Sequence, residues 1–265
     1  MTKATLTTPF SAGRVALLCR NRALEDLPAL AISAGVLAGI NLLTLLFAGR
    51  TSMNDPDGQS WTFTVMLAGL ILASAAFRGM HDGRGGTDWI LLPASGAEKY
   101  AAALFSYLFA YPVAASIATM ALSAILSLIE LAAGGPGGNI WNPIAAIGLK
   151  GWANYAIAAL VLAVGSATFR KRALIKTIGV IVAFSLAAAG IFFLVVFIVR
   201  DMRGLPSFSF MARNGGFSVD GDFAWKAPPA ASVLLDIARY VILPVAALAY
   251  GYFRVAEKEA LDEVQ

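Results

Sequence analysis

Long stretches with almost no charged side chains limit this chain's fold more than any other feature. Residues 28–48 contain no Asp, Glu, Lys, Arg or His and are mostly apolar. About 20 such residues are enough to cross the roughly 30 Å hydrocarbon core of a bilayer. Five further stretches have a similar character. The predicted spans are residues 28–48, 61–77, 100–129, 152–169, 174–199 and 232–253.

Composition and pattern agree on the type of membrane fold. The 265 residues are 58% hydrophobic and 14% charged, whereas soluble domains carry about 25% charged residues. The apolar runs are continuous and do not alternate with polar residues, as strands of a membrane barrel would. In lipid, a continuous run satisfies its backbone groups as a helix. We therefore predict an all-α membrane protein, with six transmembrane helices forming a single domain over residues 1–265.

The segment before the first span, residues 9–27, mixes apolar side chains with Arg14, Arg20 and Arg22. This mixture predicts a helix that lies in the membrane interface. A basic flank that merely orients the first span is the alternative. The first apolar run begins too late and is too long for a signal peptide, so we expect it to be retained.

Lys and Arg residues beside the spans predict the orientation. With the N-terminus inside, 13 of the 20 basic residues lie on the cytoplasmic side and seven lie outside. Because cytoplasmic loops carry the excess of Lys and Arg, both termini are predicted to be cytoplasmic. The basic stretch between residues 200 and 231 opposes this bias mildly. That stretch is either a cap that dips into the membrane or an irregular external loop, and residues 130–150 are predicted to be a flexible external connection.

Residues 78–99 form the most informative segment outside the predicted spans. A glycine cluster precedes a short apolar run that Pro93 ends, since the residue before proline avoids helical geometry. Ser95 and Glu98 have the spacing of a capping box. The helix predicted from Gly96 to Ile129 would be about 50 Å long at 1.5 Å per residue. It must therefore protrude, tilt or kink at Pro112. The segment is either a platform against which a soluble partner can push or an ordinary loop with a helix cap.

Several classes of function are disfavoured by what the sequence lacks. Charged residues inside the predicted spans are confined to positions near span ends, so a secondary transporter has no proton or ion relay. There is no nucleotide-binding glycine motif and no hydrolase or metalloprotease motif. One Cys and one His leave little for metal binding or catalysis. We expect no enzymatic activity, no cofactor, no metal and no nucleic-acid partner. Energy for any uphill transport would have to come from another polypeptide.

Two segments and the overall layout resemble a known family. The opening segment reads FSAGRVALLCRNRALEDLPALAISAGV, and the segment before the third span reads DWILLPASGAEKY. The first is similar to the cytoplasmic connecting helix, and the second to the LPxSxxEK segment, of permease subunits of type-2 ATP-binding-cassette (ABC) transporters. The layout of six spans, a long external loop before the last span and a short charged C-terminus is also similar. The chain thus resembles a permease of the bacterial exporter class.

This resemblance implies a site, partners and a location. It implies that residues 78–99 contain the segment that docks on the ATPase, formed or positioned by Asp88, Trp89, Leu91, Leu92, Pro93, Ser95, Glu98 and Lys99. It implies a cytoplasmic ABC ATPase subunit, a second permease subunit in a homodimer or heterodimer, and membrane lipid as partners. The location would be the bacterial plasma (inner) membrane. The alternative is a non-transporting membrane assembly or scaffold protein whose cytoplasmic loop recruits a partner.

Overall fold

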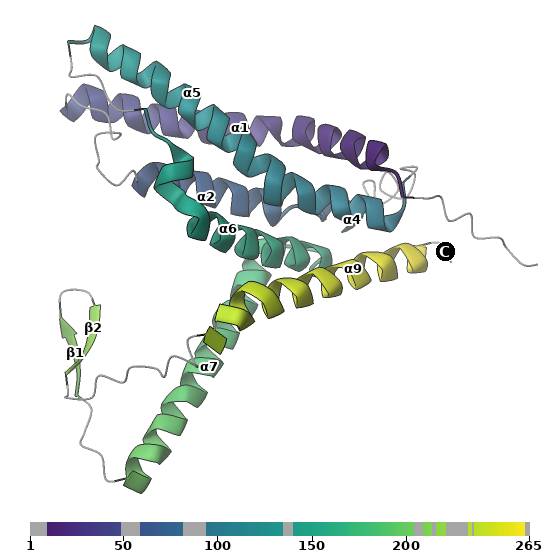
Figure 1. Cartoon of the computed structure of the whole chain (residues 1–265), viewed down its shortest axis with the longest axis vertical. Coiled ribbons are helices and arrows are strands. Elements are labelled where there is room, and N and C mark those ends of the chain that lie inside the picture. The colour runs from purple at the N-terminus through teal and green to yellow at the C-terminus, as the bar shows by residue number, and fades with distance from the viewer. Residues whose placement is uncertain are drawn as a thin grey trace, which may run out of the picture.

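The computed structural model describes residues 10–48, 59–81, 94–134, 140–203, 209–213, 216–220, 233–234 and 236–262. These residues are helical apart from one hairpin (Figure 1). The α-helices are α1 (Ala12–Ala48), α2 (Gln59–Ala73), α4 (Gly96–Phe105), α5 (Tyr111–Ala132), α6 (Pro143–Thr168), α7 (Ala173–Arg203) and α9 (Leu243–Asp262). Shorter helices are η2 (Arg78–His81), η3 (Ser106–Ala110) and η4 (Ala238–Ile242). The hairpin pairs β1 (Ser209–Arg213) antiparallel with β2 (Gly216–Asp220).

Five helical segments among the described residues are long and apolar enough to cross a membrane. They are Ala12–Ile40, Trp61–His81, Gly96–Ala132, Pro143–Thr168 and Ala173–Ile191. The expectation of a helical integral membrane protein is therefore met. The predicted sixth span, residues 232–253, falls largely on η4 and α9, which are not among these five. The hairpin is an addition to the predicted all-α fold, and it lies in the stretch predicted to be a cap or an irregular loop.

The first helix is longer than the first predicted span. Helix α1 runs through Pro28 as one helix of 37 residues. The segment predicted to lie in the interface and the first predicted span are therefore parts of the same helix. At 1.5 Å per residue α1 is about 55 Å long, which exceeds the roughly 30 Å of a hydrocarbon core.

The predicted helix after residue 95 is confirmed. It begins at Gly96, and Ser95 and Glu98 form both hydrogen bonds of a capping box. It continues through η3 and α5 to Ala132. The π-helical turn η3 ends at Ala110, two residues before Pro112. Because proline lacks the N–H that would continue the α-helical pattern, a local switch to wider π-type bonding accommodates it without ending the helix.

The predicted connection at residues 130–150 is largely wrong. Helix α5 continues to Ala132, and α6 begins at Pro143, nine residues before the predicted span. The reason is a local helix signal in a stretch rich in glycine. The Asn142 side chain accepts hydrogen bonds from the backbone N–H groups of Ile144 and Ala145, and Pro143 occupies the first turn. Gly148, at φ 65°, interrupts the helical geometry one turn later.

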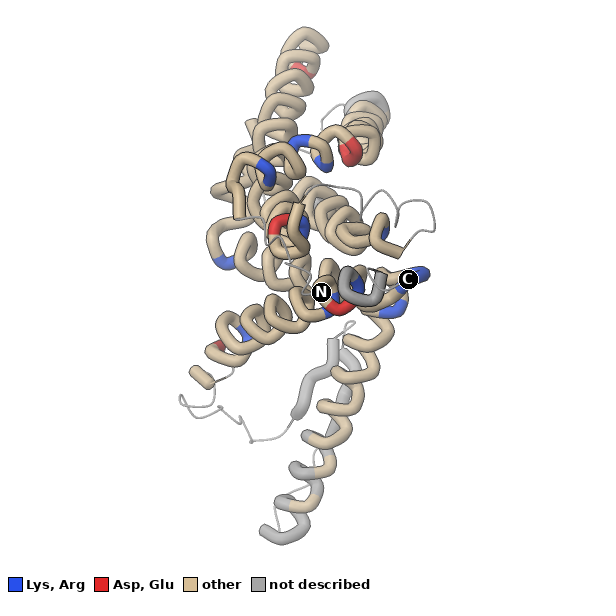
Figure 2. Tube along the Cα trace, turned by 90° about the vertical axis from the view of Figure 1, so that its right-hand side faces the viewer, with Lys and Arg blue, Asp and Glu red and all other residues tan. Residues whose placement is uncertain are grey.

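Contacts between helices define two ends of the bundle. Arg14 pairs with Glu98, and Asp26 accepts a hydrogen bond from Tyr107, so α1 runs parallel to α4 and α5. We call the end containing the starts of α1 and α4 the Glu98 end. The last turns of α2, α6 and α9 lie at the same end (Figure 1). Figure 2 views the molecule from this side, and most of the helical tube is free of charged residues.

The core lies where α2, α6 and the continuous helix Gly96–Ala132 meet, with Val255 of α9 packed against them. At the end opposite the Glu98 end, Trp61 and Trp141 are buried with ring centroids 5.6 Å apart. Deeper in the bundle, Tyr111 and Tyr155 stack with centroids 6.0 Å apart, and both rings lie next to Gly69 of α2. Helix α7 departs from the other helices (Figure 1), and its side chains are exposed on nearly every face.

Candidate functional site

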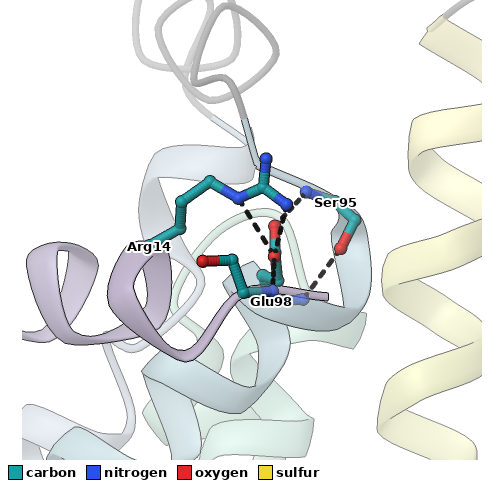
Figure 3. A network of polar contacts seen from close by, with 4 residues as sticks. Arg14, Ser95 and Glu98 are labelled. Carbon is teal, nitrogen blue, oxygen red and sulfur yellow. Dashed lines mark hydrogen bonds and ion pairs between the residues drawn. The ribbon is translucent and has the colours of Figure 1, made fainter. Parts of the chain in front are cut away.

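The Glu98 carboxylate is the centre of a polar network at the start of α4 (Figure 3). Its Oε1 atom accepts a hydrogen bond of 2.6 Å from the backbone N–H of Ser11. The same atom accepts bonds of 3.1 Å and 2.9 Å from Nε and Nη2 of Arg14. The other oxygen, Oε2, accepts a bond of 2.8 Å from the backbone N–H of Ser95. Every one of these contacts donates a hydrogen to the carboxylate, as an ionised carboxylate requires.

The Glu98 carboxylate is buried, so its negative charge must be compensated by nearby donors. The Glu98 side chain has 0% exposed surface, whereas the Arg14 side chain is 31% exposed. A buried carboxylate is unfavourable unless it is paired and hydrogen-bonded. The guanidinium and the two backbone N–H groups supply that compensation from two separate segments. Removal of either segment would leave a charged group buried without its partners.

Local sequence explains why Glu98 points back toward Ser95. Ser95 is extended, with φ −68° and ψ 155°, which is the usual geometry of a residue before a helix. Its hydroxyl accepts a hydrogen bond of 3.3 Å from the backbone N–H of Glu98. The reciprocal bond from Ser95 N–H to the Glu98 carboxylate completes the capping box. The cap fixes the first turn of α4 and leaves Oε1 available to α1.

Two more contacts extend the pairing of α1 with α4 and its continuation. The thiol of Cys19 lies 3.6 Å from the carbonyl oxygen of Ala102. Farther along, the phenol of Tyr107 donates a hydrogen bond of 3.0 Å to Asp26 Oδ2. Contacts therefore run from Glu98 to Tyr107 along the same side of α1. The two helices form one unit over their first turns.

The turn that follows α2 is hydrogen-bonded to both α1 and α6. Nη1 of Arg22 donates a hydrogen bond of 2.7 Å to the carbonyl oxygen of Ala76. The backbone N–H of Phe77 donates to Oγ of Ser166 at 3.1 Å. His81 Nε2 lies 3.1 Å from the Ser166 carbonyl oxygen. The helices on either side of residues 82–93 are thus held together through α1.

The structure brings together three of the eight predicted site residues. Ser95, Glu98 and Lys99 lie on the first turn of α4 or directly before it, and Glu98 and Lys99 are buried. The other five lie outside the described residues, namely Asp88, Trp89, Leu91, Leu92 and Pro93. Burial assigns Glu98 a positioning role, because a side chain without exposed surface cannot touch a soluble partner.

Sequence reasoning missed the residues of α1 that complete the network. Ser11 and Arg14 are 87 and 84 positions away from Glu98. Asp26 was also overlooked, although it lies within a segment long and apolar enough to cross a membrane. The sequence shows only that Arg14 and Glu98 carry opposite charges and that each precedes a predicted span starting on the same side of the membrane. This signal does not by itself pair the two side chains.

The described residues contain no group of three or more His, Cys, Asp and Glu side chains that could hold a metal ion. Comparison with protein families, curated proteins and solved structures finds no match for this chain.

Proposed function

We propose that this chain is the transmembrane permease subunit of an ABC exporter, driven by a separate ATPase subunit. The observation that supports this most is the buried Glu98 network. It joins the start of α1 to the start of α4, within residues 78–99, where the resemblance implies ATPase docking. A permease needs a rigid connection of this kind, because a displacement of its cytoplasmic loop must be transmitted to its membrane helices.

Helix lengths support a platform outside the membrane. Helix α1 and the continuous helix Gly96–Ala132 each have 37 residues, or about 55 Å. They run parallel and start at the same end. A hydrocarbon core of about 30 Å leaves roughly 25 Å of each helix to tilt or to project. We place the excess at the Glu98 end, where α1 carries Arg14, Arg20 and Arg22. In this arrangement the first turns of α1 form the interfacial segment.

The distribution of basic residues supports the orientation. In the proposed topology six helices cross the bacterial inner membrane, and the sixth is formed by η4 and α9. The Glu98 end, with both termini, then faces the cytoplasm, as the excess of Lys and Arg on that side predicts. A second permease subunit, identical or related, completes the pathway, and lipid covers the remaining apolar surface.

Coupling would pass through contacts present in the structure. Closure of the ATPase on residues 88–93 displaces Ser95 and the first turn of α4. Because Glu98 is bound to Ser11 and Arg14, α1 moves with α4. The Arg22 contact with Ala76 carries the displacement to the end of α2. Packed helices joined by buried polar contacts transmit such displacements as a unit.

Co-purification with an ATPase tests the proposal. The full chain is isolated from its native membrane in mild detergent, and the ATP hydrolysis that co-purifies with it is measured. Trp89→Ala should reduce retention of the ATPase by removing a docking side chain. Glu98→Gln should reduce stimulated hydrolysis, because it weakens the contact between Arg14 of α1 and Glu98 of α4.

The matched control is Glu257→Gln, which removes an exposed carboxylate paired with Arg254 in the last part of α9. It should leave both readings unchanged. Unchanged ATPase retention and unchanged hydrolysis in Trp89→Ala and Glu98→Gln would contradict this placement of the coupling segment. A soluble partner that binds residues 78–99 without any nucleotide hydrolysis would favour the alternative, a membrane scaffold.

A further inference from the structure

The turn between α6 and α7 concentrates positive charge. Four basic residues, Arg170, Lys171, Arg172 and Lys176, occur within seven positions, and all four are exposed. None of them forms an ion pair with another described residue. This turn lies at the Glu98 end, because the last residues of α6 contact Phe77 and His81.

Among the described side chains, few are available to neutralise this charge. No Asp or Glu occurs between Glu130 and Asp201. In the last part of α9, Glu257 is already paired with Arg254. Exposed cations that are close together repel one another, so an anion bound among them lowers the free energy of the turn.

The turn also holds its cations in a restricted arrangement. Helix α6 ends at Thr168 and α7 begins at Ala173, which leaves four residues between them. Arg172 has a φ of 54°, a left-handed geometry that side chains other than glycine seldom adopt. The Lys176 ammonium lies 5.7 Å from the centroid of the Phe169 ring, within range of a cation–π contact.

Exposed apolar surface begins directly beside the cations. Ile175 is 65% exposed and Ile178 is 45% exposed, and exposed apolar side chains continue along α7. A ligand that satisfies both features has a negative head and a hydrocarbon tail. An anionic phospholipid has this composition, whereas an acidic protein or a nucleotide would leave the apolar surface uncovered.

We propose that the α6–α7 turn binds the headgroup of an anionic phospholipid, with an acyl chain lying along the exposed face of α7. Clusters of Lys and Arg beside membrane helices attract anionic headgroups in this way. The site is separate from the Glu98 network. It goes beyond the proposed transport function and does not depend on it.

Quenching by brominated lipids tests this site in the full chain. A Cys19→Ser, Ile175→Cys protein is labelled with a fluorophore and placed in phosphatidylcholine vesicles with or without phosphatidylglycerol. We expect brominated phosphatidylglycerol to quench the label more strongly than brominated phosphatidylcholine at equal mole fraction. Arg170→Gln, Lys171→Gln and Arg172→Asn together should abolish this preference. Each charge removed should weaken binding of the anionic headgroup about fivefold. Asn is chosen at 172 because it tolerates the left-handed backbone.

A second triple variant separates a local site from general attraction. Arg20→Gln, Arg78→Gln and Arg254→Gln remove the same number of positive charges at the same end, from exposed positions on α1 and η2 and from a partly buried position on α9. This variant should keep the preference for phosphatidylglycerol. Equal loss in both triple variants, or equal quenching by the two lipids in the parent protein, would overturn the proposal. Loss of the preference on addition of inorganic phosphate at constant ionic strength would also overturn it, in favour of a free-phosphate site.

Discussion

Helix α2 packs so closely against Tyr111 and Tyr155 at Gly69 that a larger residue there should measurably destabilise the protein. A Cβ atom at this site in α2 would lie 2.5 Å from Oη and 2.7 Å from Cε2 of Tyr155, and it would also overlap Cε1 of Tyr111. Both rings are held in place, because Tyr111 donates to the Val65 carbonyl oxygen at 2.6 Å and Tyr155 donates to the Tyr107 carbonyl oxygen at 3.0 Å. Neither ring can retreat without losing its hydrogen bond.

The change to test is Gly69→Ala. Overpacking costs about 1–3 kcal/mol, and loss of one tyrosine hydrogen bond costs about 1 kcal/mol more. The higher helix propensity of alanine stabilises the folded state by about 1 kcal/mol. The free energy of unfolding should therefore fall by about 1–3 kcal/mol, the overpacking range, since the other two contributions nearly cancel.

Thermal unfolding of the detergent-solubilised chain, followed by its loss from the monodisperse fraction, measures this change. Gly39→Ala is the matched control, because its added Cβ would meet nothing within 4 Å. The control should raise the unfolding midpoint slightly, by helix propensity alone, while Gly69→Ala lowers it. Equal midpoints for the two variants would refute the close approach of α2 to Tyr111 and Tyr155.

Three further predictions concern buried polar groups. Arg14→Gln and Glu98→Gln should each lower the thermal unfolding midpoint. The double variant should lower it by less than the sum of the two single falls, because the two side chains share their hydrogen bonds. Additive falls in the midpoint would argue against the pair. Thr177→Val should raise the midpoint, because the buried Thr177 hydroxyl has no hydrogen-bond partner among the described residues. A clear fall in the midpoint would show that the hydroxyl is satisfied. Tyr111→Phe should lower the free energy of unfolding by about 1 kcal/mol through loss of one hydrogen bond, and denaturant titration would reveal an unchanged value if the bond were unimportant.

Features set by neighbouring residues could be predicted from the sequence. The capping box is one of them, because Ser95 and Glu98 are three positions apart and their spacing alone fixes the first turn of the helix. Most of the membrane helices follow from continuous apolar runs in the same way. The start of α6 was missed because glycine density outweighed the shorter signal from Asn142 and Pro143.

Features set by distant residues could not be predicted. The Glu98 carboxylate has a partner 84 positions away, and no local pattern shows that Arg14 reaches it. The unbroken helix through Pro28 was equally hidden. Proline normally favours a helix boundary, so separating the interfacial segment from the first span was the natural expectation. Near Pro28 the helix is held by a tertiary contact, the hydrogen bond from Tyr107 to Asp26, which the local pattern does not show.

Photo-crosslinking from position 89 tests whether residues 78–99 dock on a separate ATPase subunit. A photoreactive amino acid replaces Trp89 in the full chain, and adducts formed in native membranes are identified by mass. A second protein carries it in place of Leu149, an exposed residue near the start of α6, at the end opposite Glu98. We expect an adduct with a nucleotide-hydrolysing subunit from position 89 and none from position 149. Absence of that adduct from position 89, or its formation from position 149 as well, would mean that residues 78–99 do not dock on such a subunit.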